Sequence, residues 1–159
     1  MTRFRYRSQK GVEMENILEK IRDTKQDKTV WLIRIMIGII ILSTGVMKLL
    51  VPMLWNAWSG QLSAAHIPFH SFNLWFVPFA EIITGLLLVS GFFSRLGSLI
   101  LFFMMTVATY VHLTVHDSSL FPLQPEAPVI PLALIAAGAY VFWHGGGAWS
   151  TDLKFTRNL

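Results

Sequence analysis

The stretch VWLIRIMIGIIILSTGVMKLLV, residues 30–51, decides the fold of this chain. It is apolar over a length that lets one helix cross the hydrocarbon core of a bilayer, which is roughly 30 Å thick. Three further apolar stretches follow at 73–93, 96–115 and 128–144, and the last of them is short for a membrane span. The sequence therefore predicts an all-α integral membrane protein built as a four-helix bundle.

The basic residues predict the orientation of this bundle. Outside the four stretches, Lys and Arg occur before the first, between the second and third, and after the fourth, at Arg3, Arg5, Arg7, Lys10, Lys20, Arg22, Lys25, Lys28, Arg95, Lys154 and Arg157. The links 52–72 and 116–127 contain neither residue type. Loops rich in Lys and Arg remain in the cytoplasm. We therefore expect both termini to be cytoplasmic and both uncharged links to be external.

The composition excludes several classes of protein. Of the 159 residues, 53% are hydrophobic and 14% are charged, which is too apolar for a soluble domain. The net charge is +4, but eleven of the thirteen basic residues flank the spans, so anionic lipid headgroups rather than nucleic acid are the expected partner. The chain has no cysteine, which excludes disulfide exchange, iron–sulfur ligation and thiolate metal sites.

The chain divides into three parts. Residues 1–28 form a polar cytoplasmic arm, 29–153 a four-span membrane domain and 154–159 a short cytoplasmic tail. Within the domain, Gly38 and Gly45 share one face of the first helix. Small residues let membrane helices approach closely, so these glycines predict tight helix packing rather than a ligand.

The link between the first two spans is richer than a simple turn. Trp55, Trp58 and Leu62 recur there at helical spacing, with Asn56 and Gln61 on the other face. This pattern is typical of an amphipathic helix that lies at a membrane interface. Pro68 is expected to end it. We therefore predict a short external interfacial helix between spans 1 and 2.

Charged residues inside the apolar stretches carry the most chemical information. On the first helix, Arg34 and Lys48 share one stripe with Gly38, Ile41 and Gly45. The stripe has to face the bundle, because lipid would leave the charges unpaired. We expect Arg34 to lie near the cytoplasmic edge, where its side chain can extend outward.

Four ionisable residues are expected to converge in the external half of the bundle: Lys48, Glu81, His112 and His116. The two histidines are four residues apart and share one helical face. Three interpretations stay open. The first is a structural Lys48–Glu81 ion pair with histidine neighbours, and the second is a quinone-binding or proton-handling pocket. The third is a metal site formed by His112, His116 and Glu81, although no flanking motif supports it.

A second charged cluster is expected at the cytoplasmic edge, formed by Arg34, Arg95 and Asp152. We predict that Asp152 neutralises one of the two arginines, with Arg95 the favoured partner. That contact would hold the Gly145–Gly147 turn against the bundle. We expect the pair to be partly wet and individually weak.

Several motifs together carry a family resemblance. They are LIRIMIGIIILSTGVMKL (32–49), LSAAHIP (62–68), AEIITGLLLVSGFFSRLGSLILFFMM (80–105) and GGGAWSTD (145–152). Over about 30–153 the chain resembles the DoxX family of small four-helix membrane proteins, except that Thr151 stands where the family has leucine. The run from Glu81 through Gly85 and Gly91 to Arg95 is the most specific part.

The resemblance implies a multi-pass protein of the bacterial plasma (inner) membrane. The members that gave the family its name are membrane subunits associated with thiosulfate:quinone oxidoreduction. The resemblance thus implies a quinone-associated or redox-complex subunit with redox-protein partners, possible quinone binding, and no metal or covalently bound cofactor of its own. The residues that it carries over are Arg34, Lys48, Glu81, Arg95 and Asp152. Two alternatives stay open, a non-enzymatic scaffold or assembly factor and a small-molecule transporter.

Overall fold

The computed structural model describes residue 24 and residues 26–125 and 127–157 of the chain. Within these residues all regular structure is helical, which confirms the predicted all-α class. The elements are α2 (Lys28–Leu50), α3 (Pro52–Ala64), α4 (His70–Ser90), α5 (Ser94–Thr114), the short 3₁₀ helix η1 (Ser118–Leu120), α6 (Val129–His144) and α7 (Thr151–Arg157).

Three of these helices, α2, α4 and α5, are long and apolar enough to cross a membrane. They correspond to the first three predicted spans, with ends shifted by a few residues. The fourth apolar helix, α6, has 16 residues, and at 1.5 Å per residue it is about 24 Å long. It is therefore shorter than the hydrocarbon core that a span has to cross.

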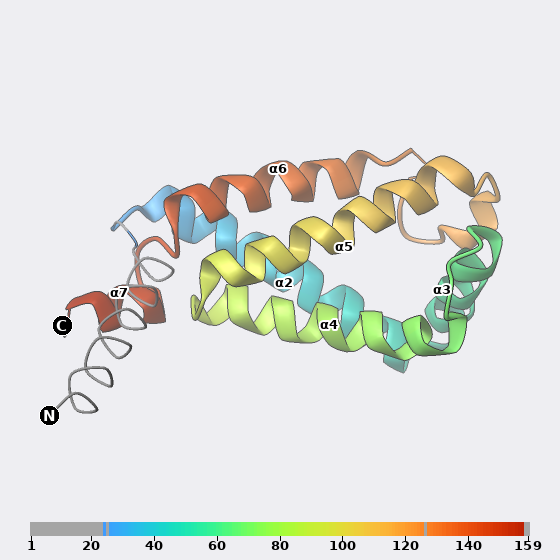
Figure 1. The fold of residues 1–159 in the computed structure, drawn as a ribbon, viewed down its shortest axis with the longest axis horizontal. Coiled ribbons are helices and arrows are strands. Elements are labelled where there is room, and N and C mark those ends of the chain that lie inside the picture. Colours follow the sequence, from blue (N-terminus) through green and yellow to red (C-terminus); the bar gives the residue numbers. More distant parts are fainter. Residues whose placement is uncertain (1–23, 25, 126, 158–159) are drawn as a thin grey trace, which may run out of the picture.

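The long helices form two closely packed pairs, α2 with α4 and α5 with α6, and the pairs meet less extensively (Figure 1). Glycines bring the first pair together. A Cβ added at Gly38 would lie 2.9 Å from the Val89 backbone nitrogen, and one added at Gly85 would lie 2.7 Å from that of Leu42. The role in packing that the sequence predicts for Gly38 is thus confirmed.

An apolar core joins the two pairs. Its buried members come from all four helices: Ile37, Ile41, Leu88, Leu101, Met105, Leu134 and Val141. It occupies the part of the bundle next to the α4–α5 turn rather than its full length. Toward the opposite end, the space between the pairs is closed by other elements.

Those elements are α3 and the segment after α5. The helix predicted in this link is present as α3, which lies across the end of the bundle (Figure 1). Leu62 and Ala65 are buried at its carboxyl end, and Phe121 is buried in the segment opposite. Gln61 Nε2 donates to Leu120 O at 2.5 Å and ties the two together. Gln61 is buried, so its predicted place on the polar outer face is wrong.

The other end of the bundle is closed by the chain after α6. Gly147 N donates to Thr24 Oγ1, and Ala148 N donates to Asp27 O, so the start of α2 and the turn after α6 are joined. The predictions for residues 1–23 of the polar arm lie outside the described residues.

Candidate functional site: the Lys48–Glu81 cavity

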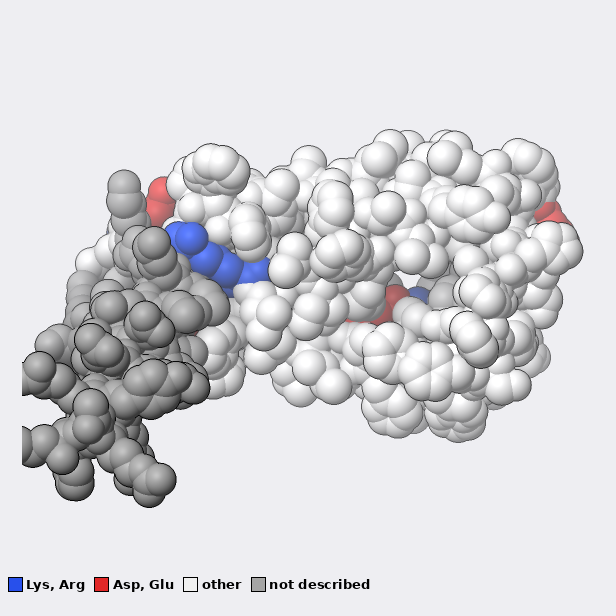
Figure 2. Space-filling model, viewed as in Figure 1, with Lys and Arg blue, Asp and Glu red and all other residues white. Residues whose placement is uncertain are grey.

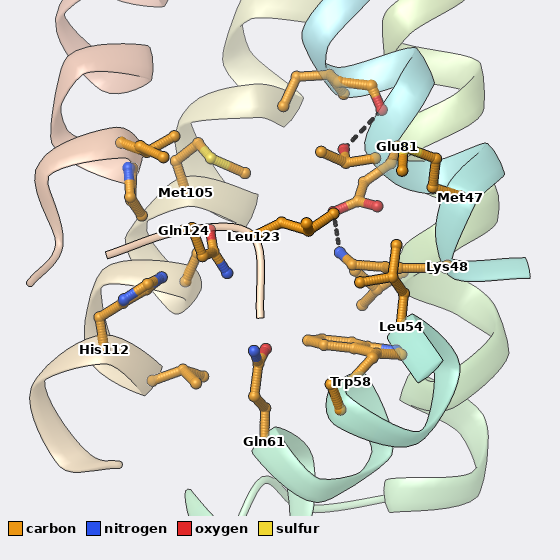
Figure 3. Close-up of a pocket in the computed structure, with 18 of the residues that line it drawn as sticks. Met47, Lys48, Leu54, Trp58, Gln61, Glu81, Met105, His112, Leu123 and Gln124 are labelled. Atoms are coloured by element: carbon orange, nitrogen blue, oxygen red, sulfur yellow. Dashed lines mark hydrogen bonds and ion pairs between the residues drawn. The ribbon is translucent and has the colours of Figure 1, made fainter. Parts of the chain in front are cut away.

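Lys48 of α2 and Glu81 of α4 meet directly inside the bundle. The Lys48 Nζ–Glu81 Oε1 distance is 2.5 Å (Figure 3). Only 5% of the Glu81 side chain and 21% of the Lys48 side chain are exposed. The Lys48 ammonium also lies 4.6 Å from the ring centroid of Trp58, within the range of a cation–π interaction.

Two local features of the sequence place this pair. Gly45 lets α4 approach α2, since a Cβ there would lie 2.9 Å from the Cβ of Glu81. Pro78 lies inside α4 and has no N–H, so the helical acceptor four residues earlier, Leu74 O, is released. Leu74 O instead accepts a hydrogen bond from Trp58 Nε1 at 3.3 Å, which anchors α3 over the pair.

A cavity of about 340 Å³ adjoins the ion pair, between the α2–α4 and α5–α6 pairs. Its walls are mostly apolar, and the polar groups among them include Lys48, Glu81, Gln61, His112 and Gln124. Figure 2 shows a hollow in this part of the surface, between α4 and α5 as seen in Figure 1, with an acidic and a basic side chain at its floor. The cavity therefore combines a hydrophobic enclosure with a few polar groups, as small-molecule sites do.

The second carboxylate oxygen of Glu81 is the distinctive atom of the site. Oε2 is buried and has no hydrogen-bond partner within the part of the chain that the structure describes. A buried acceptor without a partner is costly, especially for a carboxylate at membrane depth. Glu81 lines the cavity, but Oε2 itself is covered, so a donor group on a ligand or a water could reach this oxygen only after the carboxylate turns toward the cavity.

The two histidines, which the sequence predicts side by side, lie in different environments. His112 is buried, lines the cavity and packs against Phe121 with ring centroids 4.4 Å apart. His116 is exposed and does not line the cavity, so its predicted place beside the other three residues is wrong. The physical reason is that α5 ends at Thr114 and Val115 is extended, which breaks the helical spacing on which the prediction relied.

The position of His116 also bears on the metal interpretation. Within the described residues, no three His, Cys, Asp or Glu side chains are grouped so that they could hold a metal ion. His112 and Glu81 line the same cavity without a third ligand of this kind. Sequence reasoning also missed Gln124 as a lining residue, since it lies in an irregular segment with no periodicity to place it.

Arg34, at the other end of α2, lies in a different environment. Its side chain is fully buried rather than extended outward, so the predicted outward orientation is wrong. Its Nη1 donates to Leu88 O and Val89 O, two carbonyls at the end of α4, and its Nε donates to Gly146 O at 2.7 Å. Helix ends leave carbonyls unpaired, and these internal acceptors hold the guanidinium inside.

Asp152 is buried on the same side. Its carboxylate accepts from Phe93 N, Ser94 N and Ser94 Oγ at 3.0–3.1 Å and caps α5 from a distance in sequence. The turn after α6 is held by Arg34 rather than by Asp152, because Arg34 binds Gly146. Arg95 follows Ser94 and is partly buried, and its pairing with Asp152 stays a prediction.

We call this second cluster the tail clamp: Arg34, Asp152 and the backbone groups that they bind. It leaves little free space. A Cβ at Gly91 would lie 2.6 Å from Ser150 Cβ and 2.9 Å from Arg34 Cζ, and a Cβ at Gly146 would lie 2.7 Å from Ser150 Cβ. The tail clamp therefore has the geometry of a structural joint and not of a binding site.

Comparison with known proteins identifies the family. Residues 29–117 match the family model described as DoxX, which covers α2 through α5 and includes both Lys48 and Glu81. The match ends before the Gly-rich tail, so the resemblance seen at 145–152 is not part of it. No curated protein and no solved structure matches the chain. This helical membrane protein, with three helices able to span a bilayer, belongs to the DoxX family.

Proposed function

We propose that this chain is a quinone-associated membrane subunit, and that the Lys48–Glu81 cavity binds the ring of the quinone. The buried Glu81 carboxylate carries the proposal, because Glu81 lines an apolar cavity and one of its oxygens, Oε2, has no partner among the described residues. An ordinary structural ion pair would be expected to satisfy both carboxylate oxygens.

The cavity suits such a ring in size and chemistry. A cavity of about 150 Å³ holds benzene, so about 340 Å³ accommodates a substituted six-membered ring. Lys48, Gln61 and His112 line it and can donate hydrogen bonds to carbonyl oxygens. The Glu81 carboxylate only accepts hydrogen bonds, so it would pair with a hydroxyl of the reduced, quinol form of the ring, and Glu81 and His112 can both release or accept a proton. A bound quinone would supply the electron chemistry, and the protein would position the ring and handle protons.

We further propose that the protein crosses the bacterial plasma membrane four times, with α6 as the fourth span and both termini in the cytoplasm. The Lys and Arg distribution supports this orientation, since the links around α3 and η1 have none. The tail clamp would then lie on the cytoplasmic side, and α3 at the external interface.

The absence of cysteine makes this topology directly testable. Single cysteines would be introduced at the exposed positions Ser63, Ser118 and Lys154. In intact cells, a membrane-impermeant maleimide should label the first two and reach the third only after lysis. Labelling of Lys154→Cys in intact cells would overturn the orientation.

The quinone proposal is tested by purifying the protein from native membranes and extracting any bound quinone. We expect about one quinone per chain in the wild type and a loss of at least about tenfold in Glu81→Gln, since the neutral amide is a weaker acceptor than a charged carboxylate and cannot exchange a proton. Asp117→Asn is the matched control, because it makes the same change at an exposed carboxylate outside the cavity. Equal quinone content in all three proteins, or none in the wild type, would overturn the proposal.

A non-enzymatic scaffold or assembly factor is the second candidate. The direct contact between Lys48 and Glu81 favours it, because an ion pair can serve helix packing alone. Copurification of a protein partner without quinone, together with normal partner binding by Glu81→Gln, would select this function. Copurification of a redox enzyme with quinone would support the first.

A further inference from the structure

The cavity lies between two packed parts of the bundle. On one side lies the apolar core, with Ile41, Met105 and Leu134 at its boundary with the cavity. On the other side lies α3, where Ala57, Trp58 and Gln61 are buried and line the cavity. The segment after α5 also lines the cavity at this end through Pro122 and Leu123, which are exposed, so α3 covers the end only in part.

At its sides, the cavity is lined by residues that are also exposed on the surface. The lining includes Val107 of α5, of which 49% is exposed, and Val77 of α4, which is half-buried. The hollow in Figure 2 lies between these two helices. A residue that both lines a cavity and lies on the surface marks its rim, so this rim is apolar. One part of the rim lies on α4 and α5, two of the helices that can span a membrane, where Figure 2 shows the hollow. Another part lies on α2 and beside α6, marked by the exposed lining residues Ile40, Met47, Leu123 and Ile130.

The cavity volume limits what can fit inside. About 340 Å³ is near the lower limit for a ligand pocket and is enough for a ring but not for a long alkyl or isoprenoid chain as well. A ligand with such a chain has to leave the chain outside the cavity. In a membrane protein, the apolar surroundings outside such a rim are the lipid acyl chains, so the chain of the ligand would lie among them.

Given the proposed quinone site, on which this inference rests, we infer that the ligand is an amphiphile with a single apolar tail and a carbonyl-bearing ring. It reaches the cavity sideways from the bilayer, through the opening between α4 and α5. The ring lies against Glu81 and Lys48, and the tail passes between Val77 and Val107 into the lipid. The polar end of the cavity selects the ring, and the apolar rim selects the tail.

The test compares two probes on the full-length protein in nanodiscs: a benzoquinone with a decyl tail and the same ring without a tail. Binding is measured by equilibrium dialysis. Wild type should bind the tailed probe at least about tenfold more tightly at equal free concentration, because the tail gains apolar contacts at the rim. Val107→Trp should narrow the opening and weaken binding of the tailed probe by about tenfold or more, with little effect on the tailless one.

Leu113→Trp is the matched control, because it places the same side chain at an exposed position of α5 that does not line the cavity. Val107→Phe gives a graded version in case the tryptophan variant does not fold. Equal binding of both probes, or tailed binding that Val107→Trp and Leu113→Trp affect alike, would overturn lateral access while leaving the quinone site standing. If neither probe binds, the proposed function itself fails. Binding of decanol as tight as that of the tailed quinone would overturn the selection of the ring.

Discussion

The Lys48–Glu81 cavity and the tail clamp are both built from buried charges on the same stripe of α2, yet the charges are used differently. In the tail clamp, Arg34 and Asp152 bind the backbone, at the carbonyl end of α4 and the amide end of α5. In the cavity, Lys48 and Glu81 bind each other, and one carboxylate oxygen has no partner among the described residues.

The difference separates a structural charge from one that is available for chemistry. A cation at a helix C-terminus and an anion at a helix N-terminus complement the helix dipoles and the unpaired backbone groups. Arg34 Nη2 also has no hydrogen-bond partner among the described residues, but Arg34 does not line the cavity. Glu81 has an unsatisfied oxygen, a neighbouring cavity and a partly exposed counter-ion, so it is the better candidate for function.

The largest expected effect is at the tail clamp. Arg34→Met should lower the free energy of unfolding by about 3–5 kcal/mol, because Leu88 O, Val89 O and Gly146 O would lose a buried charged donor. Unfolding in mixed detergent micelles, followed by circular dichroism, measures it. Arg34→Lys should recover less than half, since an ammonium cannot donate with the geometry of a guanidinium. A loss below about 1 kcal/mol would contradict the structural role.

Breaking the Lys48–Glu81 ion pair should lower the free energy of unfolding by less than Arg34→Met does. Lys48→Met should destabilise the protein by about 1–3 kcal/mol, because the Glu81 carboxylate loses its donor. Adding Glu81→Leu should recover much of that loss, since no buried charge then remains.

The same double-variant test sharpens the comparison at the tail clamp. Asp152→Leu should rescue Arg34→Met only in small part, because the two charges attract each other but each also binds backbone groups of its own. Rescue as complete as that at the ion pair would show that the two regions are alike.

Alanine substitutions at two glycines test whether the tail clamp is packed more tightly than the surroundings of the cavity. Gly91 has φ +67°, and an added Cβ would meet Ser150 Cβ and the Arg34 guanidinium, so Gly91→Ala should destabilise by about 1–3 kcal/mol. At Gly60, near the cavity, the one close atom is the end of the flexible Leu120 side chain. Gly60→Ala should therefore stay within about 1 kcal/mol of wild type, helped by the helix propensity of alanine. Equal melting temperatures for both variants would contradict the difference in packing.

The smallest effect is expected at Asp117, an exposed counterpart of Asp152. The Ser119 hydroxyl and backbone N–H bind its carboxylate and hold the pKa of Asp117 below its usual value. A lowered pKa means that the charged form stabilises the folded state, and that this contribution is lost only as the pH falls through the folded pKa, below about 4. NMR titration should show the shift, and Ser119→Ala should move the pKa of Asp117 upward. An unchanged pKa in that variant would remove the explanation.

Part of the candidate site could be predicted from helical spacing alone. Lys48 and Glu81 lie on inward faces because a charge in an apolar helix has to avoid lipid, and topology gives them similar depth. The same reasoning failed for His116 because it assumed that α5 continues past Thr114. It could not find Gln124, which lies in an irregular segment that only tertiary contacts place beside the cavity.

The sequence by itself determined the helical class, the three long spans, the facing stripe of α2 and the family, because these depend on local periodicity and on residue types along one helix. Only the tertiary structure decided what the buried charges bind. Every helix end offers unpaired backbone groups, so the path of the tail after α6 selects those that Arg34 and Asp152 contact. The cavity likewise exists only because two tight helix pairs separate beyond their common core, and that depends on contacts between residues far apart in the chain.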